Sequence, residues 1–78
     1  MESIPIYFKW DGKNYEGTAD PVRIDSNRTY YNITAPGIKA VIEPIADDDV
    51  ALKWVDYETQ LETDLTYILG NAIESAEA

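Results

Sequence analysis

Carboxylates are the side chains of this sequence with the most evident capacity for chemistry, because Asp and Glu account for 15 of its 78 residues. Three of them are adjacent, at Asp47, Asp48 and Asp49, and Ca²⁺ and Mg²⁺ prefer oxygen ligands of this kind. Consecutive residues of a turn point in different directions, however, and the alternating acids and central glycine of a calcium-binding loop are absent. We therefore expect a solvated loop between two strands at this segment, and no metal site.

Nucleophilic catalysis has little support in the sequence. The chain contains no cysteine and no histidine, so the common catalytic triads and dyads are excluded. A serine–lysine pair would have to use Ser3, Ser26 or Ser75, and the residues flanking them do not indicate a nucleophile turn. The four glycines are isolated from one another, so there is no phosphate-binding loop. We therefore expect a protein that is not an enzyme and that carries no cofactor.

Charge is distributed unevenly along the chain. Residues 1–42 contain five acids and five bases, whereas residues 43–78 contain ten acids and a single base, so the net charge of −9 arises in the second part. Such a field repels nucleic acids and anionic membranes and attracts basic partners. Ordinary solubility is the simpler explanation, since many acidic surfaces have no dedicated partner. The candidate acidic patch consists of Asp47, Asp48, Asp49, Glu58 and Glu62.

The periodicity of the sequence predicts the elements that position these residues, beginning with a hairpin. Residues 4–10 alternate between apolar and polar side chains, as in a half-buried strand. Asp11-Gly12 is a strong hairpin signal, and residues 15–19 form the expected return strand, which Asp20-Pro21 should end.

Two registers of this hairpin remain open. A two-residue turn at Asp11-Gly12 pairs Phe8 with Tyr15, whereas a turn at Gly12-Lys13 pairs Trp10 with Tyr15. The two registers differ by an even number of residues, so both keep the same side chains directed inward.

Three further strands are expected before the pattern changes. They cover residues 29–34, which are rich in β-forming side chains, residues 38–43, which Pro44 should close, and residues 50–55. Residues 22–24 form only a short extension between turns.

A helical period follows the last strand. Apolar residues recur at helical spacing from Tyr57 to Ala76, and Asp56 suits the N-cap. Gly70-Asn71 has the composition of a C-cap, but the apolar period persists beyond it, so we expect a helix over about residues 57–76. Leu69 and Ile73 fall on the flank of this helix, against the sheet edge or a second subunit.

These elements predict an α+β fold in a single small domain spanning residues 1–78. An antiparallel sheet of about five strands, open or barrel-like, would be packed by one C-terminal amphipathic helix. A chain of this length buries roughly 60% of its unfolded surface, so the core is thin. The predicted core consists of Ile4, Ile6, Phe8, Trp10, Ile33, Ile42, Leu52, Trp54, Leu61, Leu65 and Ile68.

The sheet face turned away from the helix is the candidate interaction face. Tyrosine with small polar and charged neighbours is typical of protein interaction surfaces, although tyrosine and threonine are also common on exposed strands for structural reasons alone. Alternation places on this face Tyr7, Lys9, Thr18, Tyr30, Asn32, Lys39 and Lys53, together with Glu16, Val41 and Val55.

The leading functional hypothesis is a small non-enzymatic protein-binding or regulatory module, which could act as a homodimer. The alternative is an acidic inhibitor, an immunity-type protein or a nucleic-acid mimic, whose carboxylates stand in for phosphates before a basic partner. A small carboxylate-dependent enzyme is a third and weaker alternative. The first five residues do not resemble a signal peptide, and no stretch approaches the ~20 apolar residues of a membrane span. We therefore expect a cytoplasmic protein that binds neither nucleic acid nor membrane.

Overall fold

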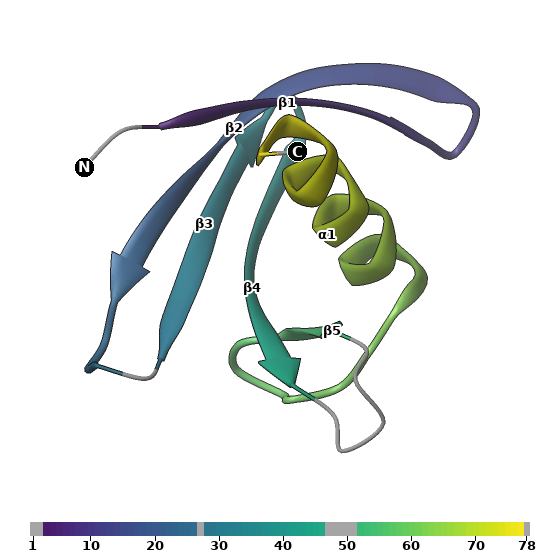
Figure 1. The fold of residues 1–78 in the computed structure, drawn as a ribbon. Coiled ribbons are helices and arrows are strands. Elements are labelled where there is room, and N and C mark those ends of the chain that lie inside the picture. Colours follow the sequence, from purple (N-terminus) through teal and green to yellow (C-terminus); the bar gives the residue numbers. More distant parts are fainter. Residues whose placement is uncertain (1–2, 27, 47–51, 78) are drawn as a thin grey trace.

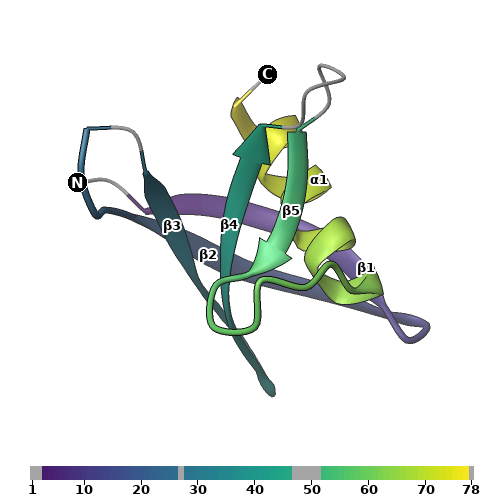
Figure 2. The same ribbon diagram turned by 90° about the horizontal axis from the view of Figure 1, so that it is seen from below.

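The chain folds as a curled antiparallel sheet with one helix packed against it (Figure 1). The computed structural model describes residues 3–26, 28–46 and 52–77. The strands pair in the order β1-β2-β3-β4-β5, and α1 lies against both edge strands, β1 and β5, in an open half-barrel (Figure 2). The predicted α+β class is therefore confirmed. The elements are β1 (Ile4–Trp10), β2 (Lys13–Arg23), β3 (Thr29–Ala35), β4 (Ile38–Ala46), β5 (Leu52–Asp56) and α1 (Asp64–Glu77).

The β1–β2 hairpin turns on two residues. Asp11 and Gly12 both have positive φ angles, 52° and 77°, as a type I′ turn requires. Phe8 pairs with Tyr15, so the first of the two predicted registers is correct. The rings of this pair stack with their centroids 5.3 Å apart.

Two strands run through prolines that we expected to end them. β2 continues through Pro21 and β4 continues through Pro44. In each case one neighbouring strand has already stopped pairing: β1 pairs with β2 only as far as Ala19, and β3 pairs with β4 only as far as Ile42. Proline is tolerated where one side of a strand is open, because the missing N–H is not needed there.

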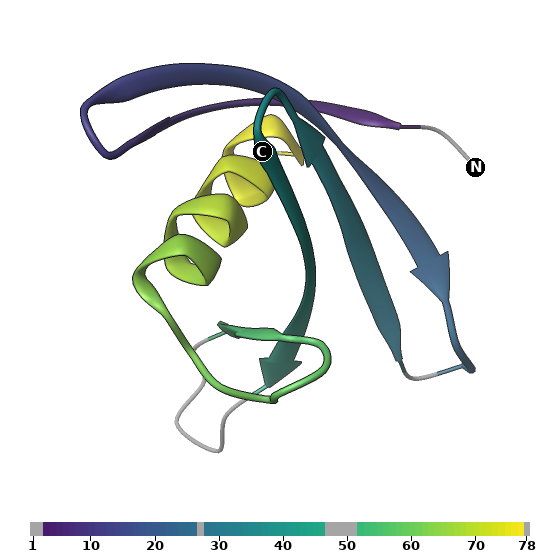
Figure 3. The same ribbon diagram turned by 180° about the vertical axis from the view of Figure 1, so that it is seen from behind.

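The bend of β2 makes this arrangement possible. Its first half pairs with β1 and its second half with β3 (Figure 3). The expected short extension at residues 22–24 is therefore largely the end of β2. The predicted fifth strand is observed as β5, and residues 50 and 51 of that prediction lie outside the described residues.

The helix starts later than the sequence indicated, at Asp64 instead of near residue 57. Asp56 does cap backbone N–H groups, but those of a turn: its Oδ1 accepts hydrogen bonds from the N–H groups of Glu58 at 2.9 Å and Thr59 at 3.1 Å. Gln60 then adopts a φ of 61°, a left-handed conformation that interrupts a right-handed helix. The predicted role of Asp56 as the helix N-cap is therefore wrong.

A pair of threonines caps the helix instead. The hydroxyl of Thr66 accepts a hydrogen bond from the N–H of Thr63 at 2.8 Å, and the hydroxyl of Thr63 accepts one from the N–H of Thr66 at 3.1 Å. This is the reciprocal arrangement of a capping box. From this start the helix continues through Gly70 to Glu77, so the expected continuation beyond Gly70-Asn71 is confirmed.

Trp54 of β5 supports three successive turns of α1. Its carbonyl oxygen accepts a hydrogen bond from the Thr66 hydroxyl at 2.9 Å, and its indole Nε1 donates one to Glu74 Oε2 at 2.9 Å. Between these two contacts the indole lies directly against Gly70, where an added Cβ would be 2.1 Å from Trp54 Cγ. Thr66, Gly70 and Glu74 are spaced four residues apart and form one stripe of the helix.

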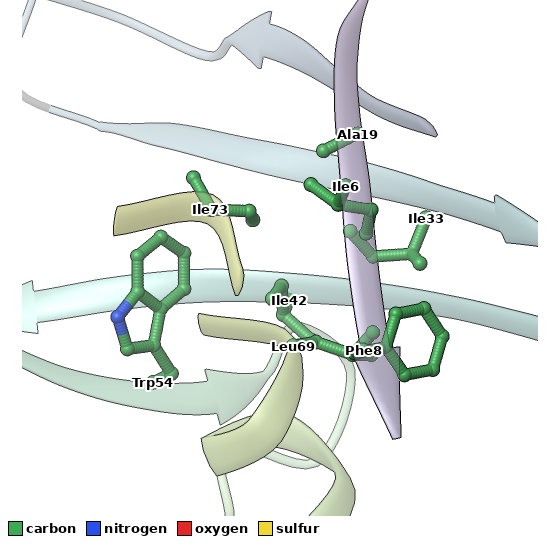
Figure 4. Packing of buried hydrophobic residues seen from close by; sticks show 8 residues of the cluster. All are labelled: Ile6, Phe8, Ala19, Ile33, Ile42, Trp54, Leu69 and Ile73. Carbon is green, nitrogen blue, oxygen red and sulfur yellow. The ribbon is translucent and has the colours of Figure 1, made fainter. Parts of the chain in front are cut away.

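The core lies between the inner face of the sheet and α1 (Figure 4). Leu69 and Ile73 are fully buried at its centre, so their predicted place on the flank of the helix is wrong. Leu61 was predicted to be core but is 63% exposed, because it precedes the helix. The buried cluster consists of Ile6, Phe8, Ala19, Ile33, Ile42, Trp54, Leu69 and Ile73.

The remaining core predictions divide into two groups. Ile4, Trp10, Leu65 and Ile68 pack against the cluster but are only partly buried. The side chain of Leu52 lies outside the described residues.

Val55 departs from the exposed position that alternation predicted. It pairs with Glu43 on the side of the sheet away from α1, and both residues are buried. A second, smaller buried region therefore lies on that side of the sheet.

Candidate functional site

The side of the sheet turned away from α1, which we call the outer face, carries the predicted interaction residues on all five strands. The sheet curls, so these residues follow the outside of the half-barrel instead of forming one flat patch (Figure 2). Tyr7 is 68% exposed, whereas Tyr30 and Asn32 are half-buried. In strand order the residues are Tyr7 and Lys9 on β1, Thr18 on β2, Tyr30 and Asn32 on β3, Lys39 on β4 and Lys53 on β5.

A hollow of about 620 Å³ opens on the outer face, between the central strands and the turn that follows β5. It brings together Asn32 and Lys39 of the predicted face with Glu58 of the predicted acidic patch. Two residues that we had not placed in a site, Asp20 and Asp56, complete its polar lining. Four strands and a turn thus bring together groups that are far apart in sequence.

Five of the seven predicted face residues do not line this hollow. Tyr7, Lys9, Thr18, Tyr30 and Lys53 lie elsewhere on the outer face. Tyr30 instead packs on Tyr57 of the turn after β5, with ring centroids 4.4 Å apart.

The charged groups of the hollow are three carboxylates and one ammonium. Asp56 uses Oδ1 to cap its turn, and Asp20 accepts a hydrogen bond from the hydroxyl of Ser3. Lys39 forms no ion pair within the described part of the chain. The lining therefore has a net negative charge that agrees in sign with the charge of the whole chain.

The predicted acidic patch is only partly covered by the structure. Asp47, Asp48 and Asp49 lie outside the described residues. Glu58 and Glu62 are both exposed, but only Glu58 lines the hollow, since Glu62 belongs to the segment that leads into α1.

An ion pair between a buried carboxylate and an exposed guanidinium lies on the same side of the sheet, where β3 and β4 separate. Glu43 is only 4% exposed and receives a forked contact from Arg28, with Nε 2.8 Å from Oε2 and Nη2 3.0 Å from Oε1. Gln60 Nε2 donates a further hydrogen bond to Oε1 at 3.1 Å and another to the carbonyl of Tyr57 at 2.9 Å. Both carboxylate oxygens are therefore occupied, and the group ties the turn after β5 to the sheet.

Sequence reasoning missed this pair. Glu43 was predicted to end a strand and Arg28 was assigned to no site, and their separation by 15 positions left no local signal. The only available indication was that the strand face on which Glu43 falls had to accommodate a charge.

The hydrogen bonds from Arg28 lower the pKa of Glu43 below its ordinary value, and they outweigh burial, which raises it. In the unfolded chain the carboxyl binds its proton near pH 4.3, whereas in the folded chain it does so only at lower pH. Between these two values the unfolded state holds more protons, so acidification through this window removes the stability contributed by Glu43.

Glu43→Gln tests this linkage. The variant should be less stable than the wild type at pH 7, and the difference should shrink as the pH falls below about 4.3. Urea unfolding between pH 7 and pH 3 gives the free energy of unfolding of the wild type and of the variant at each pH. Glu16→Gln, on the exposed part of β2, is the matched control. A difference that stays constant over this range would contradict the assigned role of Glu43.

Two further properties of the described residues bear on metal binding and membrane insertion. No group of three or more His, Cys, Asp or Glu side chains in this part of the chain is arranged to hold a metal ion. None of its helices is long and apolar enough to cross a membrane.

Comparison with known proteins identifies no relative: no protein-family model, curated protein or solved structure matches the chain. Functional inference therefore depends on the surface chemistry of the chain itself.

Proposed function

We propose that the chain is a small non-enzymatic protein-binding module that contacts its partner through the outer face. The observation that carries this proposal is the hollow, which concentrates Asn32, Lys39 and three carboxylates on the outer face. A concave site with a few convergent polar groups is the usual form of a specific binding site.

A lysine or arginine side chain of the partner fits the chemistry of the hollow. Asp56 keeps one carboxylate oxygen beyond its turn contacts, and Glu58 is exposed beside it. A guanidinium or ammonium group can bind two such oxygens with charge-assisted hydrogen bonds. The net charge of −9 would also attract a basic surface to the molecule.

The buried carboxylate supports a binding module over a carboxylate-dependent enzyme. Glu43 has both oxygens engaged by Arg28 and Gln60. Its lowered pKa keeps it ionised near neutral pH, which is the opposite of the raised value that a general acid requires.

An acidic inhibitor or nucleic-acid mimic is the second candidate, and the segment between β5 and α1 favours it. Residues 56–64 contain four acids and no base, and all but Asp56 among these acids are exposed. A mimic distributes its binding energy over many carboxylates, so its affinity falls steeply with salt. A module whose hollow accepts one basic side chain instead concentrates its binding energy at one local site.

Filling the hollow should separate these functions. Thr34 is exposed on the outer face beside Lys39, and Thr34→Trp places an indole over the hollow without changing the charge. Asn14→Trp adds the same side chain at an exposed β2 position away from the hollow and is the matched control. Affinity capture from a lysate of the source cells, followed by mass spectrometry, compares the proteins that each variant binds. We expect Thr34→Trp to capture at least about tenfold less of a specific protein than the wild type, and Asn14→Trp to capture as much as the wild type.

The outcomes of this capture experiment are distinct. Equal capture by both variants that disappears at high salt would favour the acidic mimic. Equal capture that survives high salt, or no capture above background by the wild-type domain, would overturn the proposed binding at the hollow.

A further inference from the structure

The hollow on the outer face has two chemically different ends. Thr34 of β3 pairs directly with Lys39 of β4, and Asn32 pairs with Val41 two residues further along the same strands. All four of these residues line the hollow. Two residues along a strand span about 7 Å, so the hydroxyl and the ammonium of the first pair belong to one end of the hollow.

The carboxylates of the hollow approach the level of the second pair. Asp20 of β2 pairs with Asn32, on the far side of β3 from Val41. The N–H of Tyr57 donates a hydrogen bond to the carbonyl of Val41 at 2.8 Å, so the turn that carries Glu58 meets the sheet at this level. The acidic end of the hollow therefore lies here, and its cationic end lies one step along β4.

The polar groups at both ends are available to a ligand. Within residues 3–26, 28–46 and 52–77, the side chains of Thr34 and Lys39 form no hydrogen bond or ion pair. At the acidic end, Asp56 keeps Oδ2 outside its turn contacts, and Glu58 is exposed. A ligand that engages both ends carries an anionic and a cationic group about 7 Å apart.

A basic residue at the C-terminus of a polypeptide has this form, because its α-carboxylate and its cationic group are separated by the length of one side chain. We propose that the hollow binds the C-terminal lysine or arginine of its partner. The α-carboxylate would contact Lys39 and Thr34, and the basic group would contact Asp56 and Glu58 with charge-assisted hydrogen bonds. This inference rests on the proposed function and specifies the part of the partner that the hollow binds.

A lysine or arginine within a chain is a poorer occupant. It supplies a cation to the acidic end but no anion to Lys39, whose ammonium would lose hydration and face a like charge in the same hollow. A free basic amino acid shares the required chemistry, but it lacks the chain that would contact the outer face around the hollow. Capture of a C-terminal carboxylate is also a recurring mode of peptide recognition.

Three short peptides test the site. They are Gly-Ala-Arg with a free C-terminus, the same peptide with an amidated C-terminus, and Gly-Ala-norleucine with a free C-terminus. Each is titrated into the ¹⁵N-labelled protein, and its affinity is read from the amide shifts of Asn32, Lys39 and Glu58. We expect the first peptide to bind at least about tenfold more tightly than either of the others, because each of the others lacks one of the two charges.

Lys39→Met tests the end of the hollow that receives the carboxylate. It should reduce the affinity ratio between the free and the amidated arginine peptides to about one, whereas Lys9→Met should keep this ratio at about tenfold or more. Lys9 is exposed on β1 and does not line the hollow, so both variants remove one positive charge and differ only in its position. The amide spectrum of each variant reports whether it is folded.

Four results would overturn the inference. They are equal affinity for the free and amidated arginine peptides, equal affinity for the arginine and norleucine peptides, an unchanged ratio in Lys39→Met, and no shifts at the hollow at millimolar peptide. Free arginine binding more tightly than the arginine peptide would also overturn it, by assigning the hollow to a small molecule.

The failure of this inference can be distinguished from the failure of the proposed function. The capture experiment with Thr34→Trp uses no peptide, so a partner lost by that variant would uphold binding at the hollow even if the peptide series failed. Failure of both experiments would remove both proposals.

Discussion

Gly70→Ala is expected to lower the free energy of unfolding by about 2–3 kcal/mol, even though alanine is the better helix former by ~1 kcal/mol. The reason is steric: a Cβ at this position would lie 2.1 Å from Cγ and 2.2 Å from Cδ1 of Trp54. The indole cannot easily retreat, because Trp54 is 5% exposed, its main-chain carbonyl is bonded by Thr66 and its ring Nε1 is bonded to Glu74. For a domain of this size the loss corresponds to roughly 10–20 °C in Tm.

Asn71→Ala is the matched control, because it makes a similar gain in helix propensity at an exposed neighbouring position. It should leave stability unchanged or raise it by about 0.5 kcal/mol. Urea unfolding of both variants followed by circular dichroism provides the comparison. If Gly70→Ala were as stable as Asn71→Ala, the contact between α1 and the face of Trp54 would be wrong.

Leu69→Ala and Leu61→Ala should differ by several kcal/mol, although both remove the same atoms. Leu69 is fully buried at the centre of the core, so its truncation should cost about 2–5 kcal/mol. Leu61 is 63% exposed before the helix begins, and its truncation should stay within about 0.5 kcal/mol of the wild type.

This pair tests the start and the phase of the helix. The sequence period led us to place Leu61 in the core and Leu69 on the flank, whereas the structure places them the other way round. Thermal unfolding of the two variants is sufficient to compare their losses of stability. A larger loss with Leu61→Ala would support a helix that begins near residue 57.

The elements that the sequence predicts well are those specified by neighbouring residues. The Asp11-Gly12 turn requires two positive φ angles, and the residue types at these positions satisfy that requirement locally. Strand ends depend on distant neighbours instead. Pro21 and Pro44 did not end their strands, because β1 and β3 had already stopped pairing beside them.

The start of the helix also depends on residues that are distant in sequence. Asp56 has the side chain of an N-cap, but a single turn and a helix present the same N–H groups to it. The turn stops at Gln60, whose side chain is drawn to Glu43 and to the carbonyl of Tyr57. That contact spans 17 residues between Gln60 and Glu43 and could not be read from local sequence.

The candidate site was predicted in part. Alternation along β3 and β4 correctly placed Asn32 and Lys39 on the face away from the helix. Asp20 was missed because β2 was expected to end beside it, and Asp56 because it was assigned to the helix. Whether such residues converge depends on sheet curvature and register, which no single segment encodes.

We propose above that the outer face binds a partner protein at its hollow. The most direct measurement is amide-shift mapping of the ¹⁵N-labelled domain, titrated with a protein that wild-type capture identifies and Thr34→Trp loses. We expect the largest shifts at Asn32, Lys39 and Glu58, and we expect Asn14→Trp to leave these shifts in place. Shifts confined to the exposed side of α1, around Tyr67, would contradict it.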